Sequence, residues 1–486
     1  MYSFLIAVSL LILGYTFYGG LVNKIFSPND RLTPANEIND GVDYVPMPTW
    51  KVFLIQLLNI AGTGPIFGAL SGAVFGPVVY IWIVFGCIFG GAVYDFFIGM
   101  ISVRHKGASI SEITGFYLGN GAKQVMRVFS IILLVMCGVV FTTGPAELLA
   151  AITPDFLTKN VWLIIILVYF FIATFLPIDK VIGHLYPFFG ICLVIMALGV
   201  SGSLLFSGKF QMPEVWNNFT NLHPEGTNIW PFMLITVACG AISGFHSTQS
   251  PMMARCIKHE KHGKRVFYGA MVAEGIIALI WAAAGVSVYP NTQALLEAGG
   301  GCSDVVYYIC QTTMGKVGMN LALIGVIICP ISSGDTAYRS ARLTIADWFK
   351  IDQSKWKNRL IPTICLLFVG AFICQIDYSI VWRYFSWANQ TLAAIGLWAI
   401  CVYLVKNNKH YIITLIPAAF MSALSITYFF CAKECLGGLF SLCGLTDVVY
   451  YPIAVIAGIV IGVTLLIQFL IYVKKHDHPL IPHRIK

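Results

Sequence analysis

Three carboxylate side chains of this chain lie in or beside long apolar stretches, where an ionisable group needs a specific role. They belong to Asp95, Glu274 and Asp335. A carboxylate removed from water holds a proton more readily, so all three are candidate proton carriers. Two of them also have a structural interpretation. Arg104 follows Asp95 just beyond the end of the same stretch, and Arg339 lies four residues after Asp335, the spacing of a helix-end salt bridge.

Neutral polar side chains point to binding chemistry in two further segments. Ser243 and Gln249 flank His246. A single histidine is more often a hydrogen-bonded packing residue than a titrating one, but its hydroxyl and amide neighbours here favour a polar cavity. Ser332 and Ser333 offer two hydroxyl oxygens within an apolar segment. They can bind a cation or, as serine in membrane helices does, the carbonyl four residues back.

The composition indicates which elements must position these residues. Of 486 residues, 58% are hydrophobic and 11% are charged, and the mean hydropathy is +0.80. Soluble domains are about 45–50% apolar and about 25% charged, so a soluble protein is excluded. Apolar runs of spanning length predict 13 transmembrane helices, near 2–22, 50–76, 77–101, 124–147, 161–178, 183–207, 229–251, 266–290, 317–338, 360–376, 379–405, 411–431 and 447–473.

The basic residues predict how these helices are oriented, because cytoplasmic loops carry an excess of lysine and arginine. Of 30 such residues, 25 fall in odd-numbered loops or the C-terminal tail, Arg383 lies within a span, and the others are Lys159, Lys209, Lys316 and Lys433. In the cytoplasmic membrane, this places the N-terminus on the outer side and the C-terminus on the cytoplasmic side. The net charge of +8 therefore reflects orientation, and no nucleic-acid partner is expected. Arg383 either reaches the outer surface or meets a bound carboxylate.

Spans 2–6 and 7–11 carry similar landmarks in the same order, which predicts an internal repeat. The first span of each set is interrupted, at residues 59–65 and at 238–244. Because each set has five spans, the second copy must be inverted. The single membrane domain of residues 1–486 then consists of an extra helix at 2–22, a first repeat at 50–207, a second repeat at 229–405 and two C-terminal helices at 411–473.

The two interruptions predict a binding site. Glycine and proline free backbone N–H and C=O groups that lipid cannot satisfy. Broken helices of inverted repeats place such groups around a substrate at the membrane midplane; a tight glycine-mediated helix crossing is the alternative. The predicted substrate-binding residues are Gly62, Thr63, Gly64, Gly240, Ser243, Gly244, His246 and Gln249.

Five longer segments are specific enough to compare with known families. They are Asp40-Gly41-Val42-Asp43-Tyr44-Val45-Pro46, the interruption from Ile60 to Gly64, Gly91-Ala92-Val93-Tyr94-Asp95-Phe96, residues 238–246 and Gly334-Asp335-Thr336-Ala337-Tyr338-Arg339. Together they resemble the carbon starvation protein A (CstA) family. The chain departs from that family in being shorter than its well-known members, and Ile55-Gln56 stands where many members carry a His-His pair.

The resemblance implies a transporter. The family is linked to peptide uptake during carbon starvation and, in some members, to proton-coupled pyruvate uptake. It is grouped with the amino acid–polyamine–organocation superfamily, whose fold is a five-plus-five inverted repeat. In that superfamily, hydroxyls of the second repeat meet carbonyls of the first broken helix around sodium, which implies a sodium site at Ala61, Gly64, Ser332 and Ser333. The coupling ion is then H⁺ or Na⁺, and no further cofactor is expected.

Enzyme motifs are missing from the sequence. His259-Glu260-Lys261-His262 is one residue short of the His-Glu-x-x-His zinc motif. We therefore predict a non-enzymatic secondary transporter in the lipid bilayer that imports a small molecule, a peptide, with H⁺ or Na⁺ by alternating access. Pyruvate or another small monocarboxylate is the alternative substrate, and a membrane sensor or channel-like protein is the alternative from another class.

Overall fold

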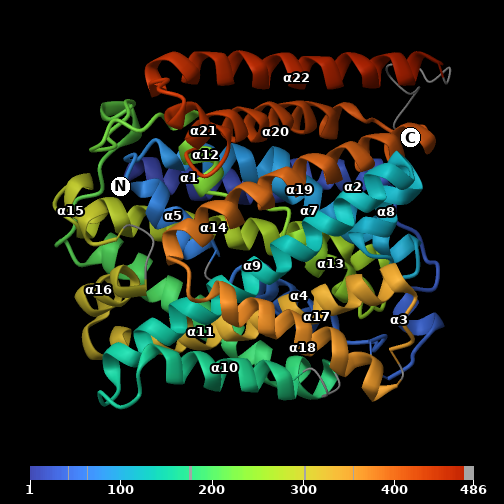
Figure 1. Cartoon of the computed structure of the whole chain (residues 1–486), viewed down its shortest axis with the longest axis horizontal. Helices are drawn as coiled ribbons and strands as arrows, with labels where there is room; N and C mark the ends of the chain where they lie inside the picture. Colours follow the sequence, from blue (N-terminus) through green and yellow to red (C-terminus); the bar gives the residue numbers. More distant parts are fainter. Residues whose placement is uncertain (42, 63, 174–177, 300–302, 354, 476–486) are drawn as a thin grey trace.

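The structure is a computed structural model that describes the chain apart from residues 42, 63, 174–177, 300–302, 354 and 476–486. Throughout the described residues the regular elements are helices, and the long ones lie side by side (Figure 1). Eight of them are long and apolar enough to cross a membrane, and a bent pair raises this to nine. An all-helical polytopic membrane protein is thus confirmed, whereas the 13 spans and the inverted repeat remain predictions.

The described α-helices coincide with many of the predicted spans, but one begins at Ser303, within the predicted loop before residue 317, and another continues to Phe349, past the predicted end at 338. In the first half they are α1 (Tyr2–Leu13), α2 (Gly19–Phe26), α3 (Pro34–Glu37), α4 (Thr49–Ile60), α5 (Gly64–Ala73), α6 (Val79–Phe85), α7 (Ala92–Arg104), α8 (Ile110–Leu118), α9 (Asn120–Ile152), α10 (Lys159–Ala173) and α11 (Ile178–Phe206). In the second half they are α12 (Leu234–Thr236), α13 (His246–Ala254), α14 (Gly269–Val288), α15 (Thr292–Glu297), α16 (Ser303–Leu323), α17 (Cys329–Phe349), α18 (Trp356–Ile373), α19 (Tyr378–Lys406), α20 (Ile412–Cys431), α21 (Leu436–Leu442) and α22 (Asp447–Lys475).

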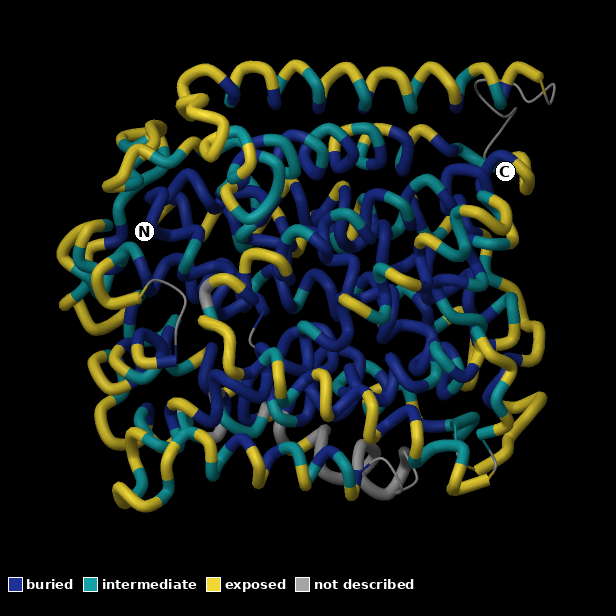
Figure 2. The backbone as a smooth tube through the Cα atoms, viewed as in Figure 1, coloured by how far each residue is buried: buried dark blue, intermediate teal, exposed yellow. Residues whose placement is uncertain are grey.

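Burial follows the position of each helix in the bundle. The central helices are buried, and the rim helices α22 and α10 alternate between buried and exposed residues (Figure 2). The exposed positions of α22 include large apolar residues such as Ile456 and Ile459, which are 62% and 51% exposed. In water this surface would be unfavourable, but lipid solvates it. The rim is therefore the face that meets the bilayer.

The first broken helix consists of α4 and α5, which meet at a bend of 46°. Helix α4 ends at Ile60, and α5 begins with Gly64 and Pro65. Proline suits the first turn of a helix because its missing N–H would have no partner there. A Cβ atom at Gly64 would collide with the Cys239 thiol, so only glycine lets the two interrupted segments touch.

The second broken helix ends at Thr236 and resumes at His246. Between them Gly240 has φ +94°, a conformation that side chains disfavour. The Asn389 side chain of α19 accepts hydrogen bonds from the Phe245 N–H at 2.6 Å and the Ser243 hydroxyl at 3.1 Å. These bonds satisfy polar groups that helix interruption would otherwise leave unpaired.

Close packing at Gly244 provides a test of this arrangement. Its N–H donates to the Asn389 carbonyl at 3.1 Å, and an added Cβ would strike that carbonyl and lie 2.7 Å from the Ala393 nitrogen. We expect Gly244→Ala to destabilise the protein by about 1–3 kcal/mol through overpacking, measured as a lower melting temperature in detergent. Gly202→Ala is the control, because no heavy atom lies within 4 Å of its added Cβ. Equal melting of the two variants would contradict the packing argument.

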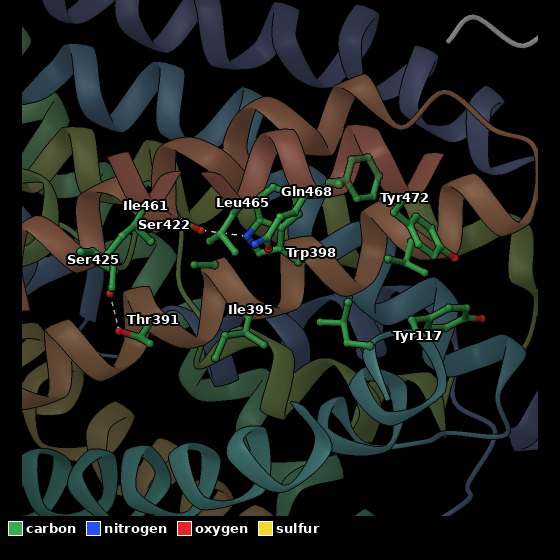
Figure 3. Close-up of a pocket in the computed structure, with 15 residues that line it drawn as sticks. Tyr117, Thr391, Ile395, Trp398, Ser422, Ser425, Ile461, Leu465, Gln468 and Tyr472 are labelled. Carbon is green, nitrogen blue, oxygen red and sulfur yellow. Dashed lines mark hydrogen bonds between the residues drawn. The ribbon is translucent and has the colours of Figure 1, made fainter. Parts of the chain in front are cut away.

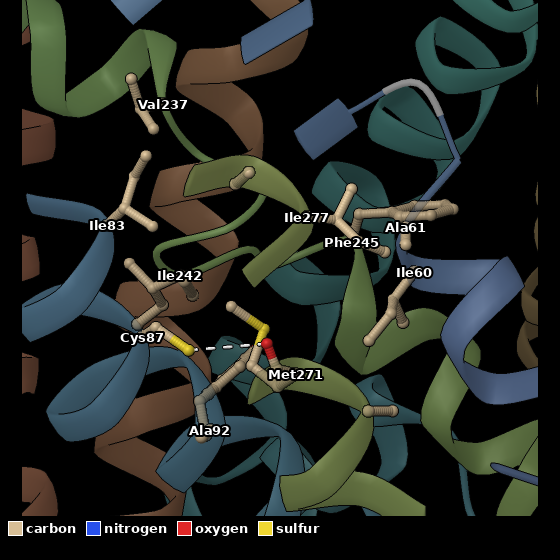
Figure 4. Close-up of a cluster of buried hydrophobic side chains, with 14 of the residues drawn as sticks. Ile60, Ala61, Ile83, Cys87, Ala92, Val237, Ile242, Phe245, Met271 and Ile277 are labelled. Carbon is tan, nitrogen blue, oxygen red and sulfur yellow. Dashed lines mark hydrogen bonds between the residues drawn. The ribbon is translucent and has the colours of Figure 1, made fainter. Parts of the chain in front are cut away.

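Apolar side chains enclose the two interruptions. Ile60, Phe245, Ile277 and Met271 belong to one buried cluster around them (Figure 4). In the same cluster the Cys87 thiol donates to the Met271 carbonyl at 3.5 Å. This apolar surrounding strengthens the electrostatic interactions of any polar group held inside it.

At the end of the bundle predicted to face the cytoplasm, a buried carboxylate connects several segments of the chain. Glu260 is 1% exposed and accepts hydrogen bonds from the Arg104 guanidinium at 2.6 Å and the Asn29 N–H at 2.8 Å. Arg31 lies 3.6 Å away. The expected proximity of Arg104 to Asp95 is therefore corrected: Arg104 pairs with Glu260, because it extends from the last turn of α7 toward the loops, whereas Asp95 lies near the start of that helix.

Candidate functional site

Two carboxylates and an imidazole meet in the centre of the bundle. Asp95 comes from α7, His246 is the first residue of α13, and Glu274 comes from α14. The His246 Nδ1 atom lies 2.8 Å from the Asp95 Oδ2 atom, and its Nε2 atom lies 3.3 Å from the Glu274 Oε2 atom. All three side chains are 0% exposed. We call this group the Asp95–His246–Glu274 triad.

The triad is suited to binding and releasing one proton. With the imidazole protonated and both carboxylates ionised it carries one net negative charge, and one more proton makes it neutral. Burial favours the neutral state, whereas the ion pairing favours the charged groups. The Asp95 Oδ1 atom and the Glu274 Oε1 atom make no hydrogen bond to the described residues, so a proton has acceptors to bind. The Cys239 thiol lies beside the triad, and the Cys87 thiol contacts Gly275, the residue after Glu274.

Cys239 connects the triad to both interruptions. Its Sγ atom, a ring nitrogen of His246 and a carboxylate oxygen of Glu274 lie within 4.8 Å of one another. The same thiol lies 3.7 Å from the Ser243 hydroxyl and contacts the position of Gly64. Sulfur and imidazole suit transition metals better than sodium, so this group is chemically distinct from the predicted sodium site. Cys239 belongs to the second interruption but had not been predicted as a site residue.

The structure brings together most of the predicted substrate-binding residues. Gly62 lies in the first interruption and Gly64 directly follows it, and Gly240, Ser243 and Gly244 lie in the second. The contact between Gly64 and the Cys239 thiol places the two interruptions against each other. Thr63 lies outside the described residues.

Buried amide side chains near the interruptions have atoms that make no hydrogen bond to the described residues. The side-chain oxygen and nitrogen of Asn59, the Oε1 atom of Gln56 and the Oε1 atom of Gln249 make no hydrogen bond there. The Gln249 amide does donate to the Thr248 hydroxyl at 3.0 Å. Buried polar groups are normally satisfied. These atoms are therefore available to water or to a polar ligand.

Some of the residues predicted to bind sodium lie against the first interruption. The Ser333 hydroxyl donates to the Leu58 carbonyl at 3.3 Å, which connects α17 to α4. A Cβ at Gly62 would lie 2.7 Å from this hydroxyl. Ser332 is also buried, and Ala61 directly follows α4. Oxygen ligands of this kind suit a hard cation, and the sodium site remains a prediction.

Asp335, the third predicted proton carrier, is not among the residues of the triad. It is 1% exposed in α17, one helical turn before Arg339, whose guanidinium donates to the Ala173 carbonyl at 2.9 Å. Its role in proton coupling remains a prediction.

A separate cavity lies between α19, α20 and α22. Its volume is about 580 Å³, and Trp398, Leu465 and Gln468 are among its lining residues (Figure 3). Most of its polar groups are already paired, for example Thr391 with the Ser425 hydroxyl at 2.6 Å. None of its lining residues belongs to the two interruptions. This cavity is therefore separate from the substrate site predicted at the interruptions.

Comparisons with known proteins identify the family of this chain and agree with its fold. The family model described as "Carbon starvation protein CstA" matches residues 1–155, 148–304 and 291–428. An uncharacterized membrane protein of Haemophilus influenzae is 42% identical over 354 residues, covering 62% of this chain and 95% of the relative. The peptide transporter CstA of Escherichia coli is 24% identical over 558 residues, covering 87% of this chain and 79% of the relative.

Two further similarities concern transport. The pyruvate/proton symporter BtsT of Escherichia coli is 25% identical over 341 residues, covering 56% of this chain and 47% of the relative. Among solved structures, the Eremococcus coleocola manganese transporter superposes with a TM-score of 0.56 at 11% identity, covering 90% of this chain and 99% of the transporter. At that identity the likeness concerns the fold alone. The chain belongs to the carbon starvation protein CstA family.

Proposed function

We propose that this protein is a secondary active transporter that imports short peptides across the cytoplasmic membrane in carbon starvation, driven by an ion gradient. Its N-terminus would lie outside and its C-terminus inside. The observation that carries the proposal is the buried triad at the second helix interruption. The relatives named as peptide transporters support the substrate class.

The triad offers a physical route for coupling a proton to substrate movement. His246 begins α13, directly after the interruption, whereas Asp95 and Glu274 belong to the continuous helices α7 and α14. A movement of α13 relative to those helices would change the two distances that hold the triad together. Proton binding and substrate binding at the interruption would then favour the same conformation, which is the thermodynamic requirement for symport.

A small monocarboxylate such as pyruvate is the second candidate substrate. The relative named as a pyruvate/proton symporter favours it, and backbone N–H groups at the start of α5 would suit either kind of carboxylate. A sensor or channel-like protein remains the alternative from another class. It offers no explanation for three titratable groups meeting at a break in the helix.

Uptake by purified protein in liposomes tests the proposal. Labelled Ala-Ala and labelled pyruvate are supplied separately, with an imposed pH gradient, an imposed sodium gradient or neither. We expect accumulation of Ala-Ala above its external concentration when the outside is acidic. Uptake that is the same under all gradients would contradict ion-coupled transport, and a measurable ion current without substrate would support the channel-like alternative.

The sodium site is tested by removing its hydroxyls. If sodium is the coupling ion, Ser332→Ala combined with Ser333→Ala should abolish the stimulation of uptake by a sodium gradient, because the cation loses two oxygen ligands. Ser9→Ala is the control, since its hydroxyl bonds only to the Leu5 carbonyl of its own helix. Unchanged stimulation in the double variant would exclude this site.

A further inference from the structure

The end of the bundle predicted to lie outside contains two adjoining cavities, of about 850 and 380 Å³. Together we call them the outer cavity. Both are lined by Glu225, Thr227, Phe232, Arg383 and Tyr428. A continuous space of this size at the mouth of a transporter can receive a small ligand before it reaches the centre.

Charges of both signs line the larger part of the outer cavity. The cations are Arg383 and Lys433, and the carboxylates are Glu225, Glu434 and Asp447. Carboxylates therefore outnumber cations by one. A ligand that carries only negative charge gains little from such a mixed field, whereas a ligand with both charges can match it.

One ion pair in the outer cavity combines an accessible cation with a nearly buried carboxylate. The Arg383 Nε atom lies 3.4 Å from the Glu434 Oε2 atom, and their side chains are 44% and 7% exposed. The Tyr428 hydroxyl donates to the other Glu434 oxygen. The Glu434 backbone carbonyl accepts a hydrogen bond from the Tyr384 hydroxyl at 2.6 Å. The carboxylate is thus held in place while the guanidinium faces the cavity.

The smaller part of the outer cavity leads toward the helix interruptions. It is lined by Ser71 of α5, by Trp382, and by Thr236, the last residue of α12. A series of aromatic ring contacts begins at Trp382. Trp382 lies 6.2 Å from Phe67 and 5.6 Å from Phe385 between ring centroids.

The series of ring contacts extends to the residue before His246. The ring of Phe141 lies 6.4 Å from that of Phe385 and 6.3 Å from that of Phe245. The ring contacts thus connect Trp382, which lines the outer cavity, with Phe245 of the second interruption. A ligand in the outer cavity would therefore lie beside these rings before it reaches the interruptions.

We propose that the outer cavity is a capture site for a zwitterion, a short peptide with both termini free. This inference rests on the proposed transport function and names the substrate class at its entrance. The C-terminal carboxylate binds the Arg383 guanidinium, which carboxylates match in a bidentate manner. The N-terminal ammonium replaces Arg383 as the partner of Glu434, with Glu225 nearby.

The exchange of partners explains why the site discriminates against a simple monocarboxylate. Pyruvate can bind Arg383 but brings no cation, so Glu434 would lose its partner while remaining nearly buried. An unpaired charge in such a position is strongly unfavourable. A zwitterion satisfies both members of the opened pair at once.

The test compares ligands that differ only in their end groups, at one fixed pH gradient. Uptake in liposomes is measured for Ala-Ala, N-acetyl-Ala-Ala, Ala-Ala-amide and pyruvate. We expect the wild-type KM for Ala-Ala to be about tenfold or more below that for either blocked peptide, the discrimination expected of one hydrogen bond to a charged group. Arg383→Gln should raise the KM for Ala-Ala about tenfold with little change in kcat.

Removing the carboxylates tests the other half of the site. Glu434→Gln should raise the KM for Ala-Ala and leave that for N-acetyl-Ala-Ala unchanged, so that discrimination between them is lost. Because Glu434 is nearly buried, Glu225→Gln, an exposed position, provides a second variant with the same expected direction. Lys209→Gln removes an exposed charge from an outer loop away from the cavity and should leave every KM unchanged.

Each outcome bears on the inference separately from the proposed function. Equal KM values for free and N-acetylated peptide, or an Arg383→Gln variant with unchanged KM, would overturn the zwitterion site even if uptake remains proton-driven. Uptake that ignores the pH gradient contradicts the proposed coupling but leaves the end-group comparison valid. If no compound is transported, equilibrium binding of Ala-Ala and N-acetyl-Ala-Ala to the purified protein makes the same comparison, and equal or absent binding overturns the inference.

Discussion

Replacing Glu274 by Gln is expected to abolish uphill uptake while leaving downhill exchange intact. In wild-type protein, symport of one proton with a net-neutral peptide allows about tenfold accumulation for each pH unit of gradient, because a tenfold ratio corresponds to about 1.4 kcal/mol. Without Glu274, the Asp95 carboxylate and the His246 imidazolium already balance each other 2.8 Å apart. The triad then needs no further proton to be neutral, and the accumulation ratio should fall to about one.

The measurement uses liposomes in two modes. Accumulation of labelled Ala-Ala is followed under an inwardly directed proton gradient, and exchange is followed with equal pH and unlabelled peptide inside. Glu274→Asp, which keeps a carboxylate, should recover part of the accumulation. Asp335→Asn separates the triad from the remaining predicted proton carrier. Full accumulation by Glu274→Gln would exclude the triad as the coupling site, and loss of accumulation only in Asp335→Asn would assign coupling to α17.

Replacing Asn389 by Ala is expected to have the largest structural effect among single polar substitutions in the site. The Asn389 Oδ1 atom accepts from the Phe245 N–H at 2.6 Å and from the Ser243 hydroxyl at 3.1 Å. All three residues are buried. Leaving a buried donor unsatisfied costs about 1–3 kcal/mol, and two donors lose their acceptor here. The second interruption should therefore lose its fixed geometry, and His246 should lose its position beside Asp95.

Thermal unfolding in detergent and Ala-Ala uptake check this prediction together. Asn389→Ala should melt at a lower temperature and transport little peptide, and Asn389→Asp should recover the two hydrogen bonds while adding a buried charge. Gln468→Ala is the matched amide control. It removes an exposed amide from the cavity of Figure 3 and should change neither property. Normal melting and uptake in Asn389→Ala would show that the backbone alone holds the interruption.

Much of the site was predictable because its chemistry is local in the sequence. Carboxylates within apolar runs identify Asp95 and Glu274, and glycine-rich interruptions identify the segments around Gly64 and Gly240. The pairing was not predictable. His246 and Asp95 are 151 residues apart, and no sequence spacing indicates that an imidazole from one broken helix meets carboxylates from two continuous helices.

The ion-pair partners of Arg104 and Arg383 were also not predictable from local sequence patterns. Arg104 lies in the same helix as Asp95, yet its guanidinium pairs with Glu260, a loop residue 156 positions away. Arg383 stands out as a basic residue within a span, but its partner Glu434 comes from the loop after α20. Nearness along a helix axis does not ensure that two side chains meet, because the direction of each depends on the helical turn it occupies.

By itself the sequence determined that the protein lies in a membrane, that it is built of helices and where two of them break. These properties follow from hydropathy and from the backbone preferences of glycine and proline, which act over a few residues. Tertiary structure alone decided that the breaks touch through Gly64 and Cys239, that His246 lies between two carboxylates, and that the outer cavity pairs Arg383 with Glu434. Those contacts depend on how distant helices pack, and the packing is set by the fit of many side chains at once.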